Sequence, residues 1–241
     1  MAVQRRNSWS VRPEITWALR QKLTMPWLAA LALCSMIGGC SYQSLGPIDE
    51  HYRAFSTHLP VKNKITVCSA YGCRTQTEFR FDGNDVAKLQ AQMAASTGMD
   101  NPEGERARVA TTLAWMEKRV GDVVGTSADR PGDDFQGNGD PTQMDCVDVA
   151  TNLTSYLLVL EHNGVLKHHT VGTIFAKEDP RLGLDGWLHY TAVIIDNKSK
   201  RHYAVDGWKL SSGIAPEVVD VDKWYVTDIL LTLGGSTRAK N

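Results

Sequence analysis

The chain has 241 residues, and its 26 basic side chains nearly balance its 27 acidic ones. Without the first 39 residues the net charge is about −5, so a basic nucleic-acid-binding face and a nucleic-acid partner are not expected. The sequence carries no internal repeat and no second hydrophobic span after the N-terminal one. Its length suits one domain with a sizeable core.

The N-terminus has the layout of a signal peptide. Five basic residues and one acidic residue flank or precede an apolar run from Met25 to Ile37, which is too short to span a membrane comfortably. The run ends in the sequence IGGC at residues 37–40, which resembles the lipobox of bacterial lipoproteins. The resemblance implies cleavage after residue 39, lipidation of Cys40 and, because Ser41 follows, anchoring in the outer membrane facing the periplasm. The alternative is an N-terminal anchor that stays uncleaved.

The next segments are predicted to be a tether and a β-hairpin. Residues 40–60 are interpreted as a lipidated tether and lead-in with one short helix at about 49–55, and residues 61–241 as a single domain. Residues 64–68 and 74–81 are β-like, and the second stretch alternates charged and aromatic side chains. Together with the turn between them they predict a hairpin.

Three cysteines remain to be explained after the expected loss of the signal peptide and lipidation of Cys40. Cys68 and Cys73 enclose a tetrapeptide in which Gly72 is able to adopt a positive φ, so a tight turn closed by a disulfide is the favoured interpretation. A redox or metal-binding pair is the alternative, and it would require CxxC spacing or further ligands nearby. Cys146 is then left unpaired, which in an exported protein calls for a chemical reason.

Hydrophobic periodicity predicts helices in the middle of the chain and strands in its last third. The predicted helices are residues 85–95, 103–120 and 146–160, the last capped by Asp145 and closed by Asn163-Gly164. The predicted strands are residues 170–176, 187–195, 201–205 and 224–231. The fold class is therefore α+β, with helices first and an antiparallel sheet after them.

Between these helices lies a long irregular segment, residues 121–141, which is rich in Gly, Asp, Asn and Pro. Loops of this length inside a compact domain are often functional. Four of its side chains offer oxygen ligands of the kind that calcium prefers, namely Asp133, Asp134, Asn138 and Asp140. A solvated acidic loop is the favoured interpretation, and no cofactor is expected.

Cys146 is expected at the first turn of its helix, where the helix dipole and the free N–H groups favour a thiolate. A thiolate nucleophile needs an imidazole to take and return a proton, and a third group to orient the imidazole. His189 lies in the apolar stretch 187–195, so it is either buried and satisfied or catalytic. A hairpin centred near Lys198 would place Asp206 beside His189, within direct or diagonal reach.

These residues resemble the pattern of a known family. The motifs are DCxDxA from Asp145, HxxAVI from His189 and YxVDxW from Tyr203. Their order and spacing resemble the bacterial transglutaminase-like cysteine proteinases, which have the papain-like or transglutaminase-like fold, and the resemblance covers about residues 139–208. The chain departs from the pattern at Val147, where members of the family often carry an acidic residue.

The resemblance implies a role for each member of the set. Cys146 would be the nucleophile, His189 the general base and then acid, and Asp206 the carboxylate that orients the imidazole. Gln143, three residues before the nucleophile, is a candidate donor to the oxyanion. The implied reaction is acyl transfer from a peptide or amide carbonyl to the thiol, followed by release to water or to an amine.

Three interpretations of function stay open on the sequence alone. In the first, an envelope lipoprotein acts as a cysteine peptidase or acyl transferase on a protein or peptide substrate. In the second, the same fold is a non-catalytic binding or scaffolding module, and Cys146 is buried and inert. In the third, the chain is an amidase that acts on the stem peptides of the cell wall. The pair His168-His169 is interpreted as a strand-edge feature rather than a metal site, because no further ligand stands at chelating spacing.

Overall fold

The structure is a computed structural model that describes residues 43–44, 46–94, 100–132, 135–178 and 188–233. All of them belong to one compact unit, Tyr42–Asn241. The predicted signal peptide, the lipidation site Cys40 and the calcium candidates Asp133 and Asp134 lie outside the described residues. Within the described ranges, no helix combines the length and the apolar character needed to cross a membrane.

The fold is α+β, as predicted, and it is built around an antiparallel sheet. Six strands form this sheet in the order β1-β5-β6-β7-β8, and β4 pairs with β6 beyond the end of β5. The strands are β1 (Gln43–Ser44), β4 (His169–Val171), β5 (Phe175–Glu178), β6 (Leu188–Asp196), β7 (His202–Asp206) and β8 (Glu217–Asp220). A separate hairpin of β2 (Lys64–Ser69) and β3 (Thr75–Arg80) confirms the predicted one.

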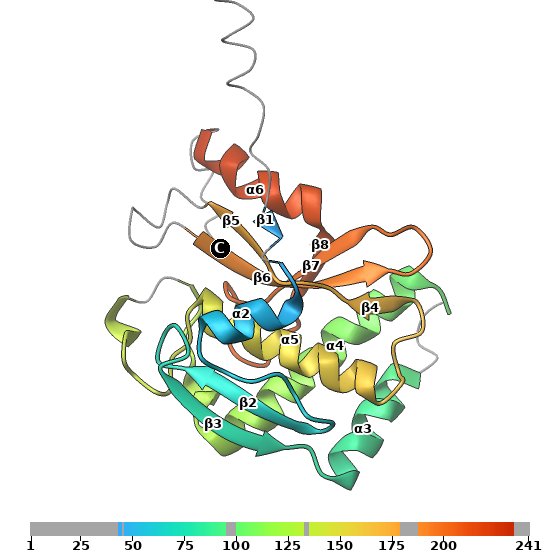
Figure 1. Ribbon diagram of the computed structural model, residues 1–241, viewed down its shortest axis with the longest axis horizontal. Helices are drawn as coiled ribbons and strands as arrows, with labels where there is room; N and C mark the ends of the chain where they lie inside the picture. The colour runs from blue at the N-terminus through green and yellow to red at the C-terminus, as the bar shows by residue number, and fades with distance from the viewer. Residues whose placement is uncertain (1–42, 45, 95–99, 133–134, 179–187, 234–241) are drawn as a thin grey trace, which may run out of the picture. The chain divides into compact units, whose positions relative to one another are not determined.

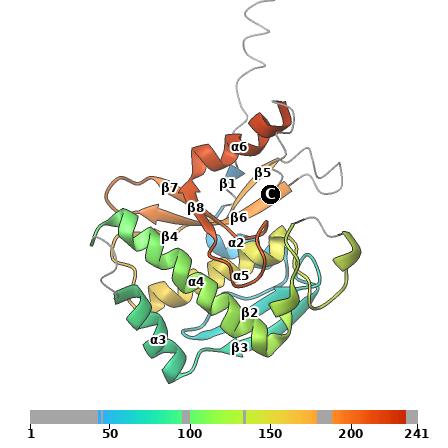
Figure 2. The same ribbon diagram turned by 180° about the vertical axis from the view of Figure 1, so that it is seen from behind.

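Helices cover both faces of the sheet (Figures 1 and 2). They are α2 (Ile48–Ala54), α3 (Gly83–Ala94), α4 (Pro102–Val124), α5 (Cys146–His162) and α6 (Val221–Leu233). α5 lies between the sheet on one side and the β2–β3 hairpin on the other, while α6 lies on the opposite face of the sheet (Figure 1). This central position explains why every residue of α5 from Cys146 to Leu160 is buried, the polar ones included.

The start of α5 is fixed by the sequence around the predicted nucleophile. Asp145 is the N-cap, and its carboxylate accepts the N–H of Asp148 at 2.9 Å, while the Asp148 carboxylate accepts the N–H of Asp145 at 3.3 Å. This capping box satisfies N–H groups that a helix end leaves open. The predicted start of the helix at Cys146 is thereby confirmed, and so is its end, where Gly164 adopts a φ of 67°.

The strands of the sheet alternate between two separate cores. On β6, Ala192 and Ile194 face the larger core around α5, whereas Val193 faces a smaller core formed with Trp224 and Tyr225 of α6. Because side chains alternate along a strand, His189 shares its face with Val193 and therefore with α6.

The predicted strand at residues 224–231 is wrong, because these residues belong to helix α6. Val221, Trp224 and Tyr225 are buried, and the intervening Asp222 and Lys223 are exposed. This spacing of three and four residues is helical. The strand β8, which was not predicted, pairs with β7 at the end of the sheet. The predicted strand 170–176 is also interrupted, and its two halves, β4 and β5, pair with different parts of β6.

The segment interpreted as a tether is part of the fold from residue 43 onward. β1 pairs with β5, and both His51 and Tyr52 of α2 are 1% exposed. The His51 imidazole lies 2.8 Å from the Thr151 hydroxyl, and the Tyr52 hydroxyl lies 2.9 Å from that of Ser155. These contacts attach α2 to α5, so the domain begins before residue 61.

The register of the β6–β7 hairpin differs by one residue from the predicted one. The pairs Ala192–Val205 and Ile195–His202 place the centre of the hairpin half a residue beyond Lys198. A shift of one residue exchanges the faces of a strand. The observed register, unlike the predicted one, puts the side chains of His189 and Asp206 on the same face.

Candidate active site

The sulfur of Cys146 lies against the main chain of β6 on both sides of His189. The thiol is 7% exposed, its sulfur is 3.5 Å from the carbonyl oxygen of Leu188, and the N–H of Tyr190 donates toward it. On this side of β6 the pairing with β7 ends at Ala192, so the described strands leave the main chain before it open to the helix. The start of α5 thus meets β6 where the sheet opens.

His189 and Asp206 form a hydrogen-bonded pair on the α6 face of the sheet. The His189 Nε2 atom is 2.7 Å from Asp206 Oδ2, which also accepts the indole N–H of Trp224 at 2.8 Å. The other carboxylate oxygen accepts the main-chain N–H of Trp208 at 3.2 Å. Burial alone would raise the pKa of Asp206, but the charge of His189 and these hydrogen bonds outweigh it and hold the pKa below its usual value.

The two ring nitrogens of His189 differ in their hydrogen bonding. Its ring lies between the indole rings of Trp208 and Trp224, with centroids 4.7 and 5.5 Å away, and the side chain is 0% exposed. The Nε2 atom is engaged by Asp206, whereas the buried Nδ1 atom has no hydrogen-bond partner among the described residues. A buried polar atom without a partner is uncommon, and Nδ1 is the atom that remains to exchange a proton.

The thiol of Cys146 differs from the expected thiolate. Burial, followed by the charge of Asp145, raises its pKa to about 12, and the more distant charges of Asp206 and Asp148 act in the same direction. The N–H of Tyr190 opposes this effect but does not reverse it. The helix dipole on which the sequence argument relied is therefore outweighed, and the resting side chain at neutral pH is the thiol.

A disulfide-closed turn supports the start of α5. Cys68 and Cys73 form the predicted disulfide, and the residues between them adopt left-handed φ values from 65° to 68° at Ala70, Tyr71 and Gly72. The N–H groups of Tyr71 and Cys73 donate to the Asp148 carboxylate at 2.9 and 2.7 Å. Successive N–H groups in this conformation form a concave set of donors, and here a carboxyl group of the same chain fills it.

Cys68 and Cys73 of this turn and Asp148 of α5 form a group of three potential metal ligands among the described residues. Both sulfurs are used in the disulfide, and the carboxylate is occupied by main-chain N–H groups. Burial and the neighbouring charge of Asp145 raise the pKa of Asp148 to about 8. This donor set suits a structural turn and not a metal ion, since the two cysteines could bind a metal only as free thiolates.

Gln143 and the described part of the acidic loop are used for structure. The Gln143 amide nitrogen donates to the Ala128 carbonyl and to the Thr142 hydroxyl, each at 3.1 Å, and its oxygen accepts the N–H of Arg130. The amide therefore fastens the loop, and the structure leaves it no N–H for an oxyanion. Of the calcium candidates, Asn138 accepts from Arg74 at 2.6 Å and Asp140 accepts from Thr142 at 2.7 Å.

A second buried histidine also pairs with a carboxylate. His169 Nδ1 is 2.7 Å from Glu105 Oε2, and Arg106 lies 3.2 Å from the other ring nitrogen. Glu105 also accepts the main-chain N–H groups of Lys167 and His168. Every ring nitrogen and both carboxylate oxygens are thus occupied, and the group joins α4 to the start of β4.

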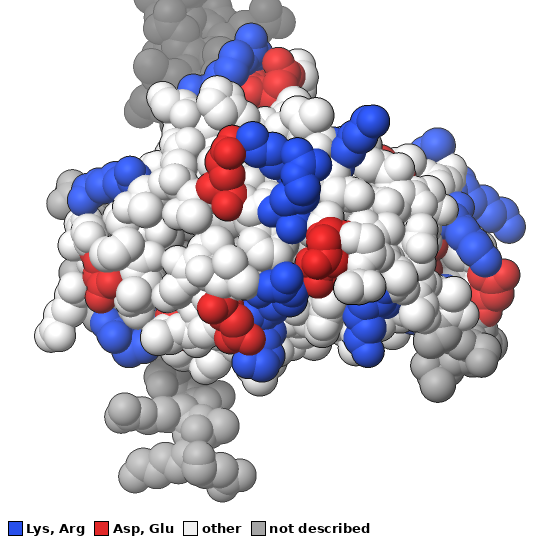
Figure 3. Space-filling view, turned by 90° about the horizontal axis from the view of Figure 1, so that it is seen from below, with Lys and Arg blue, Asp and Glu red and all other residues white. Residues whose placement is uncertain are grey.

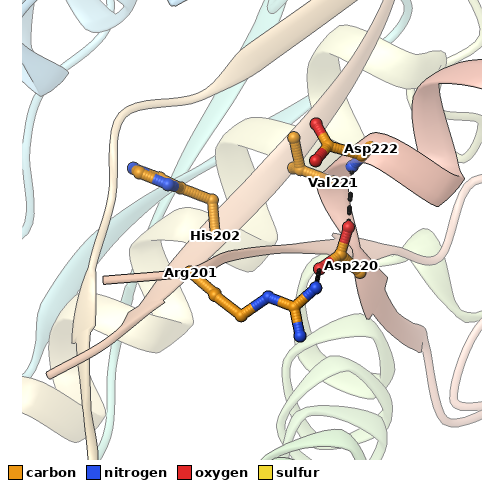
Figure 4. Close-up of a pocket in the computed structure, with 5 residues that line it drawn as sticks. All are labelled: Arg201, His202, Asp220, Val221 and Asp222. Carbon is orange, nitrogen blue, oxygen red and sulfur yellow. Dashed lines mark hydrogen bonds and ion pairs between the residues drawn. The ribbon is translucent and has the colours of Figure 1, made fainter. Parts of the chain in front are cut away.

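The surface shows where the described molecule is hollowed and charged. A small pocket is lined by Arg201, His202, Asp220, Val221 and Asp222 (Figure 4). His202 begins β7 and Asp206 ends it, so this pocket lies at the opposite end of the strand from the Cys146 site. On the face shown in Figure 3, basic and acidic side chains are interspersed and neither sign forms a continuous patch.

The structure brings His189 and Asp206 into contact and places Cys146 against the main chain on both sides of His189. It also adds residues that the sequence argument did not include. Trp224 lies in the segment expected to be a strand, so its contact with Asp206 was not anticipated. Lys177 is buried in β5 opposite His189, and the signal for it was a lone lysine inside the apolar run TIFAKE.

Comparison with known proteins supplies no relative. No family model, curated protein or solved structure matches this chain. Fold and site together define an α+β protein in which a buried His–Asp pair lies on an antiparallel sheet, and a buried free Cys at the start of a helix lies against the main chain next to that His.

Proposed function

We propose that the chain is a cysteine peptidase or acyl transferase in which Cys146 attacks a peptide or amide carbonyl, with His189 as the proton carrier and Asp206 as its orienting carboxylate. The observation that carries this proposal is the state of His189. One ring nitrogen is bound to a carboxylate, the other has no described partner, and a free thiol lies against the main chain beside it. A free thiol next to a histidine that is oriented by a carboxylate supplies the three groups that an activated nucleophile requires, and the thiol–imidazole hydrogen bond would form when substrate binds.

The proposed reaction starts from the neutral thiol. As the Cys146 sulfur bonds to the carbonyl carbon, its proton passes to Nδ1 of His189, and Asp206 stabilises the imidazolium that forms. The tetrahedral intermediate then breaks its C–N bond, and the leaving amine takes the proton from Nδ1. A thioester on Cys146 remains. Water or an amine attacks it with His189 again accepting the proton, and the thiol is regenerated.

The raised pKa of the thiol decides how the proton moves. With a pKa of about 12, the thiolate fraction at neutral pH is very small, so a preformed thiolate contributes little. Proton transfer during attack, as in hydroxyl nucleophiles activated by histidine, bypasses this limit. His189 is therefore assigned the role of a general base and not only that of a counter-ion.

The proposal is tested by acylation with an activated ester. Full-length protein is mixed with p-nitrophenyl acetate, and the acetyl group is located by peptide mass mapping. We expect acetylation of Cys146 that falls by about 10²- to 10⁴-fold in His189→Asn. His202→Asn, at the far end of β7, is the matched control and should keep the wild-type rate. Equal rates in wild type and His189→Asn would overturn the proposal.

One observation favours the second candidate, a non-catalytic binding or scaffolding module. The thiol is buried and its pKa is raised, which is what an inert structural cysteine shows. The acylation experiment separates the two candidates, because an inert thiol would react slowly and without regard to His189. An amidase of cell-wall peptides would share the site and differ only in its substrate, so it is tested by release of amine from stem peptides.

We also propose that the chain is an envelope lipoprotein anchored through Cys40, on the strength of the sequence IGGC at residues 37–40. Metabolic labelling with a radioactive fatty acid should mark the wild type, and Cys40→Ala should stay unlabelled and accumulate as the longer precursor. A Cys40→Ala protein that is labelled and shortened as usual would place the processing site elsewhere.

A further inference from the structure

We propose that Lys177 is a positioning residue for the His189–Asp206 pair, acting through Trp224. The inference deepens the proposed acyl-transfer function and rests on it. Lys177 lies on β5 directly opposite His189, and cross-strand partners project from the same face of a sheet. Its side chain is 3% exposed, although it ends in an ammonium group.

The ammonium group is held by Trp224 in two ways. The Lys177 Nζ atom donates a hydrogen bond to the Trp224 carbonyl oxygen at 2.7 Å, and it lies 3.9 Å from the centroid of the indole ring. A cation at that distance from an indole face is attracted by the ring, most strongly where water is excluded. Lys177 therefore fixes both the main chain and the ring of Trp224.

Trp224 passes this restraint to the site. Its indole N–H donates to the same Asp206 oxygen that binds His189, and its ring lies next to the imidazole. A turn of the indole would remove one of the hydrogen bonds that hold the carboxylate and would loosen the histidine. Burying an ammonium group is costly unless it is compensated, and an apolar side chain would fill the same space at lower cost. The hydrogen bond to the Trp224 carbonyl oxygen and the contact with its ring supply part of that compensation, so Lys177 and Trp224 depend on each other.

The expected role of the charge follows from the groups around His189. The described elements bring Asp206 from β7, the Cys146 thiol from α5 and Lys177 from β5 to this histidine, while α6 contributes the uncharged Trp224. Because Lys177 is the cross-strand partner of His189, its ammonium group should oppose a further positive charge on the imidazole. Removing the ammonium group therefore lowers the cost of a positive charge next to Asp206 and should change the pH dependence of the reaction.

The test is the pH profile of Cys146 acetylation by p-nitrophenyl acetate in the full-length protein. Lys177→Met removes the charge and the hydrogen-bond donor, and Lys177→Gln removes the charge but keeps a donor. We expect both variants to move the acid limb of the profile upward by about one pH unit and Lys177→Met to lower the maximal rate about tenfold. Lys177→Arg, which keeps the charge, should retain the wild-type limb.

Thermal melting and circular dichroism show which variants fold. If Lys177→Met does not fold, the pH profile of Lys177→Gln tests the role of Lys177. A folded neutral variant whose profile overlays that of the wild type would overturn the role of Lys177. His189→Asn is measured alongside. If the wild type reacts no faster than His189→Asn, the proposed function fails as a whole. If only that histidine variant is slow, the acyl-transfer site stands and the inference about Lys177 alone is rejected.

Discussion

The molecule contains two buried histidine–carboxylate pairs that look alike at the level of the hydrogen bond. His189 with Asp206 and His169 with Glu105 have the same 2.7 Å separation, and both imidazoles are almost completely buried. They differ in what the remaining atoms do. The second ring nitrogen of His169 lies within hydrogen-bonding distance of Arg106, whereas that of His189 has no partner in the described structure.

The difference separates a structural pair from a candidate reactive one. Glu105 accepts two main-chain N–H groups as well as His169, so the pair closes a junction between a helix and a strand. Asp206 is held by the indole N–H of Trp224 and the main-chain N–H of Trp208, and Cys146 lies against the main chain of the strand that carries its histidine. A buried histidine beside a carboxylate is therefore not a site in itself, because the free nitrogen and the neighbouring thiol carry the distinction.

The largest effect on the acetylation rate is expected when each carboxylate in turn is changed to its amide. Asp206→Asn should lower the rate of Cys146 acetylation by about 10⁴-fold, because an amide cannot stabilise the imidazolium and can favour the wrong tautomer. Glu105→Gln should leave the rate of the folded protein unchanged. The rates are measured under single-turnover conditions with an activated ester.

An unchanged rate in Asp206→Asn would remove this residue from the site. Asp196, the carboxylate at the end of the same strand as His189, is already occupied, since it accepts the N–H groups of Lys198 and Ser199 at 2.9 and 2.7 Å in the hairpin turn.

Stability should show the reverse order. Glu105→Gln places an amide N–H against a main-chain N–H in either orientation, so we expect a loss of about 3 kcal/mol in the free energy of unfolding. Asp206→Asn can turn its oxygen toward His189 and Trp224 and meet only the longer Trp208 contact, which should cost about 1 kcal/mol. Urea denaturation followed by circular dichroism measures both. Equal losses would mean that the two pairs contribute equally to the free energy of unfolding.

A smaller effect is expected from loss of the disulfide. The turn that it closes binds Asp148 near Cys146 and has no part in the His169–Glu105 pair. Replacing both Cys68 and Cys73 by Ser should lower the free energy of unfolding by about 2 kcal/mol, since the closed loop is short. The set of N–H donors around Asp148 should loosen with it, and the acetylation rate should fall while the Glu105 junction is unaffected. A variant with wild-type stability and rate would show that the turn holds its shape without the bond.

The thiol count gives the least perturbing check of the same assignment. Alkylation of mature protein should modify one cysteine without reductant and three with it, as measured by intact mass, because Cys146 is free and the other two are bonded. A bridge between Cys146 and either of the others would contradict the catalytic assignment.

Cap and turn preferences of neighbouring residues were enough to predict the surroundings of Cys146. The capping residues Asp145 and Gly164 bound helix α5 where the sequence indicated, and a turn with Gly72 between Cys68 and Cys73 closed as expected. Each of these depends on residues close together in the chain. Turn and cap preferences act over such distances, so a single sequence contains them.

The rest of the site depends on contacts between distant segments. The segment from Trp224 reads as a strand because a short apolar run does not reveal its period, and its helical form follows from the core it shares with β6. The side chains of His189 and Asp206 share a face only because the hairpin register is one residue away from the symmetric one. The burial of Cys146, which raises its pKa, is likewise set by the layers around α5.

The most direct test of the account is the pH dependence of Cys146 alkylation by iodoacetamide, an uncharged reagent, in wild type and His189→Asn. The thiolate fraction grows about tenfold with each pH unit below a pKa of about 12, so the variant should show this slope throughout. The wild type should react about 10²-fold faster at pH 7 and converge with the variant at alkaline pH, because His189 takes the proton where hydroxide is scarce. Profiles that overlay from pH 6 to pH 10 would contradict the assignment of His189 as the base for Cys146.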